Sequence, residues 1–320
     1  MAQGASTRFG AKPTQVGIIS KFAGASALAA VLTCTVGCAS QSPTDGTSSA
    51  ARTGRPHVLV TISTFVSFAR AVAGDRADVE SLVPVGASPE DFQPTPRDIE
   101  KLQRADILIE NGLGLETWLA RTIDNAKNEK LAIVTATDGL PVKNGNPHLW
   151  MDPELARGYV AAIARALATR DPAGRSVYER NAAAYEGRLH ALAMQVAARI
   201  ATVPKNSRAM IVFHNAWQYY DDRFGLRTVG VIELSPGQDP NPKYVNDLVT
   251  LARANHVRAI FAEHEYSPKL VQTLAQSAGI ATVENLYDDS IGTDPRVTDY
   301  VSMLNYDTAT IVAALRGAKP

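Results

Sequence analysis

Residues 173–202 read AGRSVYERNAAAYEGRLHALAMQVAARIAT, and this stretch decides how the chain is organised. It contains no proline and only two glycines, Gly174 and Gly187, and its large apolar side chains recur at helical spacing. About 28 residues of α-helix form a rod of roughly 42 Å. We therefore expect one long helix that runs along a two-lobe protein and permits only small relative motions of the lobes. The apolar side chains are Tyr178, Tyr185, Leu189, Leu192, Val196 and Ile200.

On the N-terminal side of the long helix, short β-branched apolar runs alternate with segments of helical character. Near-continuous apolar strands that alternate with helices are typical of a parallel sheet with both faces covered. Pro96 and Pro153 each suit the first turn of a helix. The predicted strands are residues 57–62, 79–83, 106–110 and 131–135, and the clearest helices are residues 96–105, 115–127 and 153–169.

The same alternation begins again after residue 207. The sequence thus predicts an α/β fold of two doubly wound lobes with mainly parallel sheets, joined by one long backbone helix. We place the N-terminal lobe at residues 57–170, the linking helix at residues 171–204 and the C-terminal lobe at residues 205–320. In the second lobe the predicted strands are residues 209–213, 228–233, 258–262 and 281–286, and the helices are residues 242–255, 268–277 and 296–316.

Residues 1–37 have the pattern of a signal peptide: their few charges are basic, and an uncharged apolar run occupies residues 22–37. That run is shorter than the ~20 residues that a membrane-spanning helix needs. It ends in TVGCAS, which resembles the lipobox of bacterial lipoproteins, although Thr35 departs from it. We predict lipid attachment at Cys38 and a flexible tether at residues 38–56; plain cleavage or an inert thiol are the alternatives.

The composition excludes several classes of protein. The chain has 32 basic and 32 acidic side chains, so no overall field attracts it to nucleic acid. Its 45% hydrophobic content over 320 residues suffices for two globular lobes and excludes a disordered chain. Both cysteines, Cys34 and Cys38, lie near the N-terminus. Any metal bound by the rest of the chain must therefore have nitrogen and oxygen ligands.

Four metal-capable side chains follow predicted strands: Glu90, His148, His214 and Asp289. In open α/β sheets, ligands bind beyond the carboxyl ends of the strands, where these four lie. They are separated by 58, 66 and 75 residues, so no local zinc-finger or HExxH spacing exists. Only the fold can bring them together, two from each lobe.

These residues and their surroundings resemble a known family. The chain contains PVG at 84–86, FQPTPRD at 92–98, NG at 111–112, PHLWMDP at 147–153 and FH at 213–214. In this order they are similar to the zinc- and manganese-binding solute-binding lipoproteins of bacterial ABC transporters, the ZnuA/TroA-like family. The resemblance implies a rigid two-lobe receptor that holds one divalent metal in the interlobe cleft and delivers it to a permease. It also implies ligand roles for His148, His214 and Asp289.

Glu90 departs from the family pattern, which has histidine after the proline where this chain reads Pro89-Glu90. A carboxylate can replace an imidazole on a metal of borderline softness, so a site of two imidazoles and two carboxylates is consistent with the chain. In the alternative interpretation, Glu90 only begins a helical turn after Ser88 and Pro89. Asp91 is then the next candidate.

Further residues compete with these or support them. Asp288 competes with Asp289 as the carboxylate ligand, and a simple turn role is also open for the pair. Glu263 and His264 follow a strand, and we assign them a second layer that orients the ligand imidazoles, or a structural role. The cargo is one divalent ion, Zn²⁺ or Mn²⁺, with Fe²⁺ possible. Residues 138–146 lack the histidine-rich loop of many zinc receptors, which removes one argument for zinc without establishing manganese.

The leading hypothesis is therefore a non-enzymatic solute-binding protein, outside the membrane and anchored by lipid. As partners it would have a permease and its ATPase, and it would act as a monomer. One alternative is an extracytoplasmic metallohydrolase, with Glu90 as general base beside three metal ligands and an activated water. The other is a receptor for a metal chelate or organic ligand, which a large open cleft would favour.

Overall fold

The computed structural model describes residues 54–292 and 294–317, all of which belong to one compact unit. The predicted signal peptide, Cys38 and all of the predicted tether except residues 54–56 lie outside the described residues. In the described part of the chain, no helix is both long and apolar enough to cross a membrane.

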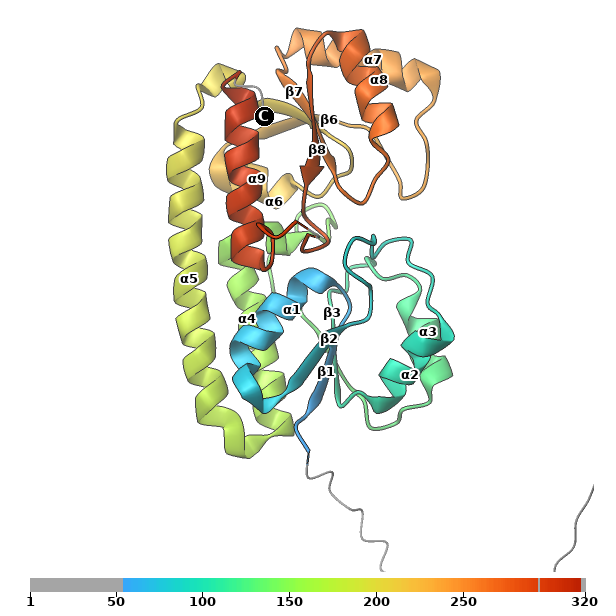
Figure 1. The fold of residues 1–320 in the computed structure, drawn as a ribbon, viewed down its shortest axis with the longest axis vertical. Helices are drawn as coiled ribbons and strands as arrows, with labels where there is room; N and C mark the ends of the chain where they lie inside the picture. Colours follow the sequence, from blue (N-terminus) through green and yellow to red (C-terminus); the bar gives the residue numbers. More distant parts are fainter. Residues whose placement is uncertain (1–53, 293, 318–320) are drawn as a thin grey trace, which may run out of the picture. The chain divides into compact units, whose positions relative to one another are not determined.

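The first half of the unit is a four-stranded parallel sheet in the order β2-β1-β3-β4 (Figure 1). All four strands predicted for this half are present, with ends that differ by one or two residues. The central strands β1 and β3 are apolar and buried because helices cover both faces of the sheet there, whereas the edge strands β2 and β4 are partly exposed. The strands are β1 (His57–Val60), β2 (Asp78–Ser81), β3 (Ile107–Glu110) and β4 (Ala132–Thr135), and the helices are α1 (Ser63–Ala73), α2 (Pro96–Arg104), α3 (Leu119–Ala126) and α4 (Pro153–Arg170).

The second half repeats this topology as a parallel sheet in the order β6-β5-β7-β8. In each sheet the second strand pairs on one side of the first strand and the third strand pairs on the other side, so the strand order reverses beside the first strand. Open α/β sheets bind ligands at such a switch point. The strands are β5 (Ala209–Val212), β6 (Arg227–Val231), β7 (Ala259–Glu263) and β8 (Ala281–Leu286), and the helices are α6 (Gln218–Phe224), α7 (Pro242–Ala254), α8 (Pro268–Ala278) and α9 (Tyr300–Leu315).

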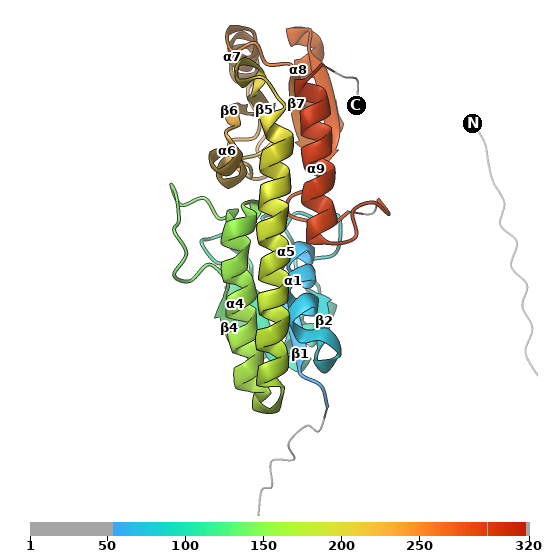
Figure 2. The ribbon, with the colours of Figure 1, turned by 90° about the vertical axis from the view of Figure 1, so that its left-hand side faces the viewer.

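The long helix α5 spans Arg175–Ala201, 27 residues, and confirms the predicted linking helix. It packs against α4 and α1 of the first half and against α9 and α6 of the second half (Figure 2). All six apolar side chains that predicted its inner face are buried. The helix therefore contributes to one core that extends through both halves.

The structure corrects the sequence analysis at helix ends and at two short helices. Helix α3 begins at Leu119 and not at residue 115, because residues 112–114 have positive φ and the chain turns there. Helix α9 begins at Tyr300 and not at residue 296, because Asp299 and Ser302 form a capping box. Helices α1 and α6 had not been located at all.

Candidate metal site

The four predicted ligand residues lie in loops that follow strands of both sheets. Glu90 lies between β2 and α2, and His148 precedes the short helical turn that leads into α4. His214 comes two residues after the end of β5, and Asp289 follows β8. The strand that ends before each loop aims it at the same region between the sheets.

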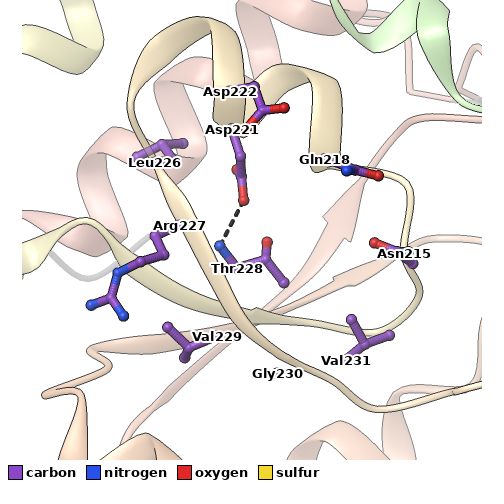
Figure 3. Close-up of a pocket in the computed structure, with 10 residues that line it drawn as sticks. All are labelled: Asn215, Gln218, Asp221, Asp222, Leu226, Arg227, Thr228, Val229, Gly230 and Val231. Carbon is purple, nitrogen blue, oxygen red and sulfur yellow. Dashed lines mark hydrogen bonds between the residues drawn. The ribbon is translucent and has the colours of Figure 1, made fainter. Parts of the chain in front are cut away.

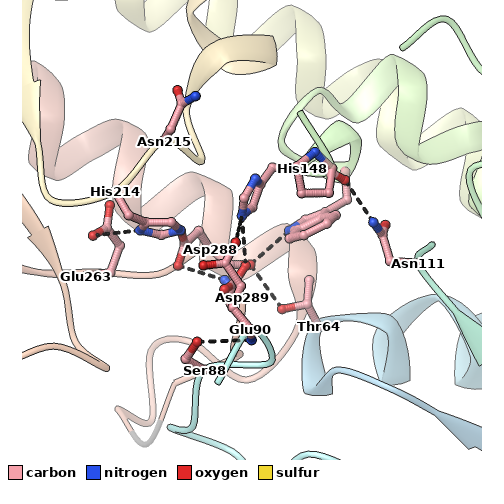
Figure 4. Close-up of polar contacts among 12 residues, drawn as sticks. Thr64, Ser88, Glu90, Asn111, His148, His214, Asn215, Glu263, Asp288 and Asp289 are labelled. Carbon is pink, nitrogen blue, oxygen red and sulfur yellow. Dashed lines mark hydrogen bonds and ion pairs between the residues drawn. The ribbon is translucent and has the colours of Figure 1, made fainter. Parts of the chain in front are cut away.

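The structure brings these four side chains together (Figure 4). The Nε2 atom of His148 lies 3.8 Å from Oε1 of Glu90 and 3.7 Å from Oδ1 of Asp289. The ring centroids of His148 and His214 are 5.3 Å apart. One ligand atom each from His148, His214 and Asp289 fits within a group whose members are all 4.8 Å or less apart.

Burial leaves several of these polar atoms without a partner. His148 and Asp289 are each 2% exposed, and His214 is 4% exposed. The Nε2 atom of His148 and both carboxylate oxygens of Asp289 have no hydrogen-bond partner among the described residues. Buried polar atoms in folded proteins are nearly always satisfied, so these atoms are suited to bind a ligand. Two imidazoles with carboxylates form a donor set that suits Zn²⁺, Mn²⁺ or Fe²⁺.

The electrostatics of Glu90, His148 and Asp289 favour a cation, whereas at His214 burial is outweighed by the neighbouring groups, Asp288 first among them, which raise the pKa of the imidazole well above its ordinary value. Burial, together with the neighbouring His214, lowers the pKa of His148 to about 3, so its imidazole is neutral at pH 7. Burial and the charge of Asp288 raise the pKa of Asp289 well above its ordinary value. Burial also raises the pKa of Glu90. A divalent cation would displace the protons of these carboxyl groups and stabilise their ionised form.

Of the two predicted supporting residues, Glu263 lies directly against a candidate ligand. Its Oε2 atom is 3.3 Å from Nδ1 of His214, while its Oε1 atom accepts a hydrogen bond from the indole N–H of Trp217 at 2.7 Å. A carboxylate in this place orients a ligand imidazole. His264 lies against other groups, with Nδ1 3.1 Å from Glu265 and its ring on that of Tyr287.

Asp288, the competitor of Asp289, takes part in a second group. Its Oδ2 atom lies 3.0 Å from Nε2 of His214, and Asp288, His214 and Glu263 also form a compact set of possible ligands. The backbone carbonyl of Asp288 accepts hydrogen bonds from Thr64 at 3.3 Å and from Trp150 at 2.9 Å. Residues of the first half of the molecule therefore hold in place the loop of the second half that contains Asp288 and Asp289.

Asn146 is a residue of the site to which sequence analysis gave no role. Its side chain contacts both the backbone N–H and the ring of His148. The signal was present in the order Asn146-Pro147-His148, because asparagine side chains often accept a hydrogen bond from the backbone two residues on. The partner of its amide nitrogen lies 69 residues away and left no such signal.

A cavity of about 250 Å³ opens beside the candidate ligands. It reaches Glu90, His148 and His214, so the site connects with the surface here. Glu90 has the most exposed side chain of the candidates, at 15%. The other lining residues are residues 144–147, Asn215 and residues 233–236.

Comparison with known proteins identifies the family of this chain. The family model of ZnuA, described as the periplasmic component A of a zinc-uptake complex, matches residues 58–314. The chain belongs to this family. Among curated relatives of this ZnuA-family chain, the iron-binding protein YfeA of Yersinia pestis is 33% identical over 262 residues, which cover 79% of this chain and 84% of YfeA. The manganese-binding lipoprotein MntA of Halalkalibacterium halodurans is 30% identical over 249 residues, 76% of this chain and 83% of MntA.

Solved structures of periplasmic metal-binding proteins share the fold of this ZnuA-family chain. The manganese-bound periplasmic metal-binding protein of Candidatus Liberibacter asiaticus superposes with a TM-score of 0.73 at 27% identity, over 82% of this chain and all of that chain. The periplasmic zinc-binding protein TroA of Treponema pallidum has a TM-score of 0.76 at 24% identity, over 83% of this chain and all of TroA. The predicted two-lobe α/β fold with its long helix is thereby confirmed.

Proposed function

We propose that this chain is an extracytoplasmic solute-binding protein of an ABC transporter, which captures one divalent transition-metal ion and delivers it to the permease. The observation that carries the proposal is the convergence of His148, His214 and Asp289 as buried candidate ligands, with atoms of His148 and Asp289 that have no hydrogen-bond partner among the described residues. They come from different halves of the molecule. Glu90 completes the set at the open side.

The ion is Mn²⁺, Fe²⁺ or Zn²⁺. Two imidazoles and two carboxylates suit tetrahedral Zn²⁺, and with bidentate carboxylates they suit the higher coordination of Mn²⁺ or Fe²⁺. The substitution of Glu90 for the expected histidine makes the set richer in oxygen, and relatives named for manganese and iron support cargo of this kind. Zn²⁺ would still bind more tightly than Mn²⁺, so the metal available to the cell decides the cargo.

The cavity argues against the alternative of an organic or chelated ligand. Sites for such ligands are clefts of about 300–1,000 Å³ lined mainly by apolar groups. The cavity here is about 250 Å³ and is bordered by polar groups such as Asn144, Asn146 and Glu233. We accordingly favour a bare ion as the ligand and a receptor without enzymatic activity.

The location and partners follow from the same proposal. Lipid attachment at Cys38 would hold the receptor at the outer side of the membrane, and a permease with its ATPase would receive the ion. The lipoprotein names of relatives such as MntA support this placement. We propose that the receptor acts as a monomer.

Metal stoichiometry tests the proposal. The soluble protein would be stripped of metal, reloaded with Mn²⁺ or Zn²⁺ and analysed by native mass spectrometry with elemental analysis. We expect one ion per chain, and weaker binding in Glu90→Ala and in His148→Ala. His190→Ala is the matched control, because His190 is an exposed histidine on α5 that pairs with Glu154.

Two results would overturn parts of the proposal. A wild-type protein that binds no divalent metal would remove the receptor function altogether. Unchanged binding in Glu90→Ala, with loss in His148→Ala, would leave three protein ligands and a position for water. That result would favour the metallohydrolase, since catalytic zinc sites keep such an open position.

A further inference from the structure

Asn146 contacts the loops of both candidate histidines with one side-chain amide. The amide oxygen accepts a hydrogen bond from the backbone N–H of His148 at 2.9 Å and lies 3.0 Å from Nδ1 of the same residue. The amide nitrogen donates to the backbone carbonyl of Asn215 at 2.6 Å. Asn215 directly follows His214, so the amide joins the first half of the molecule to the second. Asn146 is itself only 6% exposed.

The partners of the amide fix its orientation. The backbone N–H of His148 can only donate, so it requires the amide oxygen of Asn146. The carbonyl of Asn215 can only accept, so it requires the amide nitrogen. An exchange of the oxygen and nitrogen positions would place donor against donor at one end and acceptor against acceptor at the other.

This orientation determines which nitrogen of His148 carries the proton. Because an acceptor oxygen faces Nδ1 at 3.0 Å, the neutral ring satisfies it as the Nδ1–H tautomer. The lone pair then belongs to Nε2, the atom that faces Glu90 and Asp289 at 3.8 and 3.7 Å. A ligand imidazole must present an unprotonated nitrogen to the metal, and second-layer partners commonly select it.

We propose that Asn146 is a positioning residue of the metal site: it holds His148 as the Nδ1–H tautomer with Nε2 toward the ion, and it fastens the His148 loop to the His214 loop. This inference rests on the proposed metal-binding function. The backbone carbonyl of Asn146 supports the same arrangement, since it accepts a hydrogen bond from Tyr219 on α6 at 2.8 Å. The Tyr219 hydroxyl in turn accepts one from the backbone N–H of Lys143 at 2.9 Å.

The tautomer can be measured directly in the stripped wild-type protein. Nitrogen NMR of protein labelled with ¹⁵N-histidine distinguishes a protonated Nδ1 from a protonated Nε2, and the loss of one signal set in His148→Ala assigns the ring. We expect the Nδ1–H form for His148. A wild-type ring protonated at Nε2 would overturn the proposal without recourse to any Asn146 variant.

Two substitutions separate the two contacts of Asn146. Asn146→Asp keeps an acceptor for His148 but loses the donor to Asn215, whereas Asn146→Ala loses both. We expect the Nδ1–H form to persist in Asn146→Asp and to give way to a mixture in Asn146→Ala. We expect affinity for Mn²⁺ and Zn²⁺ to fall about 10- to 100-fold in Asn146→Ala and less in Asn146→Asp.

Asn206→Ala is the matched control. Asn206 is an exposed asparagine in the short turn before β5, where its side chain lies 3.4 Å from that of the neighbouring Ser207. We expect its tautomer and affinity to equal those of the wild type. If Asn146→Ala keeps either the tautomer or the affinity of the wild type, the positioning role is wrong. If the wild type binds neither metal, the proposed function fails instead, and the tautomer of His148 still reports on Asn146.

Discussion

Glu90 differs from the other candidate ligands in its surroundings. Its side chain is 15% exposed, whereas that of Asp289 is 2% exposed, and it borders the cavity that leads to the surface. It also stands where the resembling family has histidine. We therefore expect the choice between imidazole and carboxylate at this one position to adjust the donor set without disturbing the buried core of the site.

Glu90→His is expected to raise the ratio of Zn²⁺ affinity to Mn²⁺ affinity by roughly tenfold, which is about 1.4 kcal/mol. The physical reason is that imidazole suits zinc, while carboxylate oxygen suits manganese. Competition titrations of the stripped protein with both ions measure the ratio. Glu90→Gln is the control that keeps the size of the side chain, and it should weaken both ions. An unchanged ratio in Glu90→His would show that residue 90 does not contact the metal.

Asp221 on α6 is a buried carboxyl group away from the metal site (Figure 3). One of its oxygens accepts a hydrogen bond from the backbone N–H of Thr228 at 2.6 Å. Burial raises its pKa from 3.8 to about 7. The folded protein therefore keeps a proton that the unfolded chain releases above about pH 4. This group's contribution to stability is fully present below pH 4 and is lost as the pH rises to about 7.

Asp221→Asn should remove this pH dependence, because asparagine keeps an oxygen for Thr228 and has no proton to lose. Relative to wild type, the free energy of unfolding of the variant is expected to rise by about 3 kcal/mol between pH 5 and pH 8. Urea denaturation at the two pH values measures the difference. Asp247→Asn removes a charge from an exposed position on α7 and serves as the control. A constant offset between Asp221→Asn and wild type would contradict the prediction.

At the scale of elements, α5 contains a glycine in its middle. Gly187 is exposed, and a methyl group added to it would meet open space. Glycine in a helix interior is less stable than alanine because it loses more backbone freedom on folding. Gly187 therefore lowers the intrinsic stability of the helix, and the packing of α5 against both halves offsets this loss.

Gly187→Ala is expected to raise the free energy of unfolding by about 0.5–1 kcal/mol. Thermal and urea denaturation both measure this change. Gly158→Ala in α4 is the matched comparison, because there a methyl group would collide with the side chain of Leu140. That variant should gain nothing or lose stability. Equal gains in the two variants would show that propensity alone, without packing, governs these helices.

Most elements could be predicted from the sequence because their signals are local. The central strands β1, β3, β5 and β7 are mostly apolar, and α5 lacks proline over its whole length. Helix α6 was missed because its seven residues, QYYDDRF, are too few to show a period. The start of α3 was misplaced because Glu116 accepts hydrogen bonds from the backbone of Asn111 and Gly112 and so stabilises a turn in its place.

Some features of the candidate site could likewise be predicted from the sequence, and others could not. The loops of His148 and His214 could be predicted because parallel strands present their carboxyl ends at one edge. The contacts of Asn146 with Asn215 and of Asp288 with His214 could not, since they join loops that only the folded chain brings together. The candidate ligands could thus be named from the sequence, while the contacts around them could not.

At the scale of the whole described unit, several contacts tie the two halves across the site. The hydroxyl groups of Ser63 and Ser290 lie 3.1 Å apart, and Arg223 of α6 forms a two-bond ion pair with Asp152 at the start of α4. Together with α5, these contacts oppose a hinge motion. A metal ion between the halves therefore has little room to draw them closer.

We expect the radius of gyration of the soluble protein to be the same within error with and without metal. Small-angle X-ray scattering of the stripped and the Mn²⁺-loaded protein measures it. The loaded form should instead be distinguished by stability, with a gain of about 2.7 kcal/mol when free metal is at 100 times its dissociation constant. A clear compaction on loading would contradict the rigid arrangement of the halves.

Helix α9 packs against α1, which lies near the start of the described residues. The backbone N–H of Tyr300 donates to the hydroxyl of Ser67 on α1 at 3.0 Å, and its ring lies 4.7 Å from that of Phe68. Helix α9 thus helps to cover α1, although 233 residues separate Ser67 from Tyr300. A contact of such sequence separation forms only after a long segment of chain has closed, so the core of the first half cannot be completed before α9 docks. Truncation within α9 should therefore harm the distant half of the molecule as much as its own.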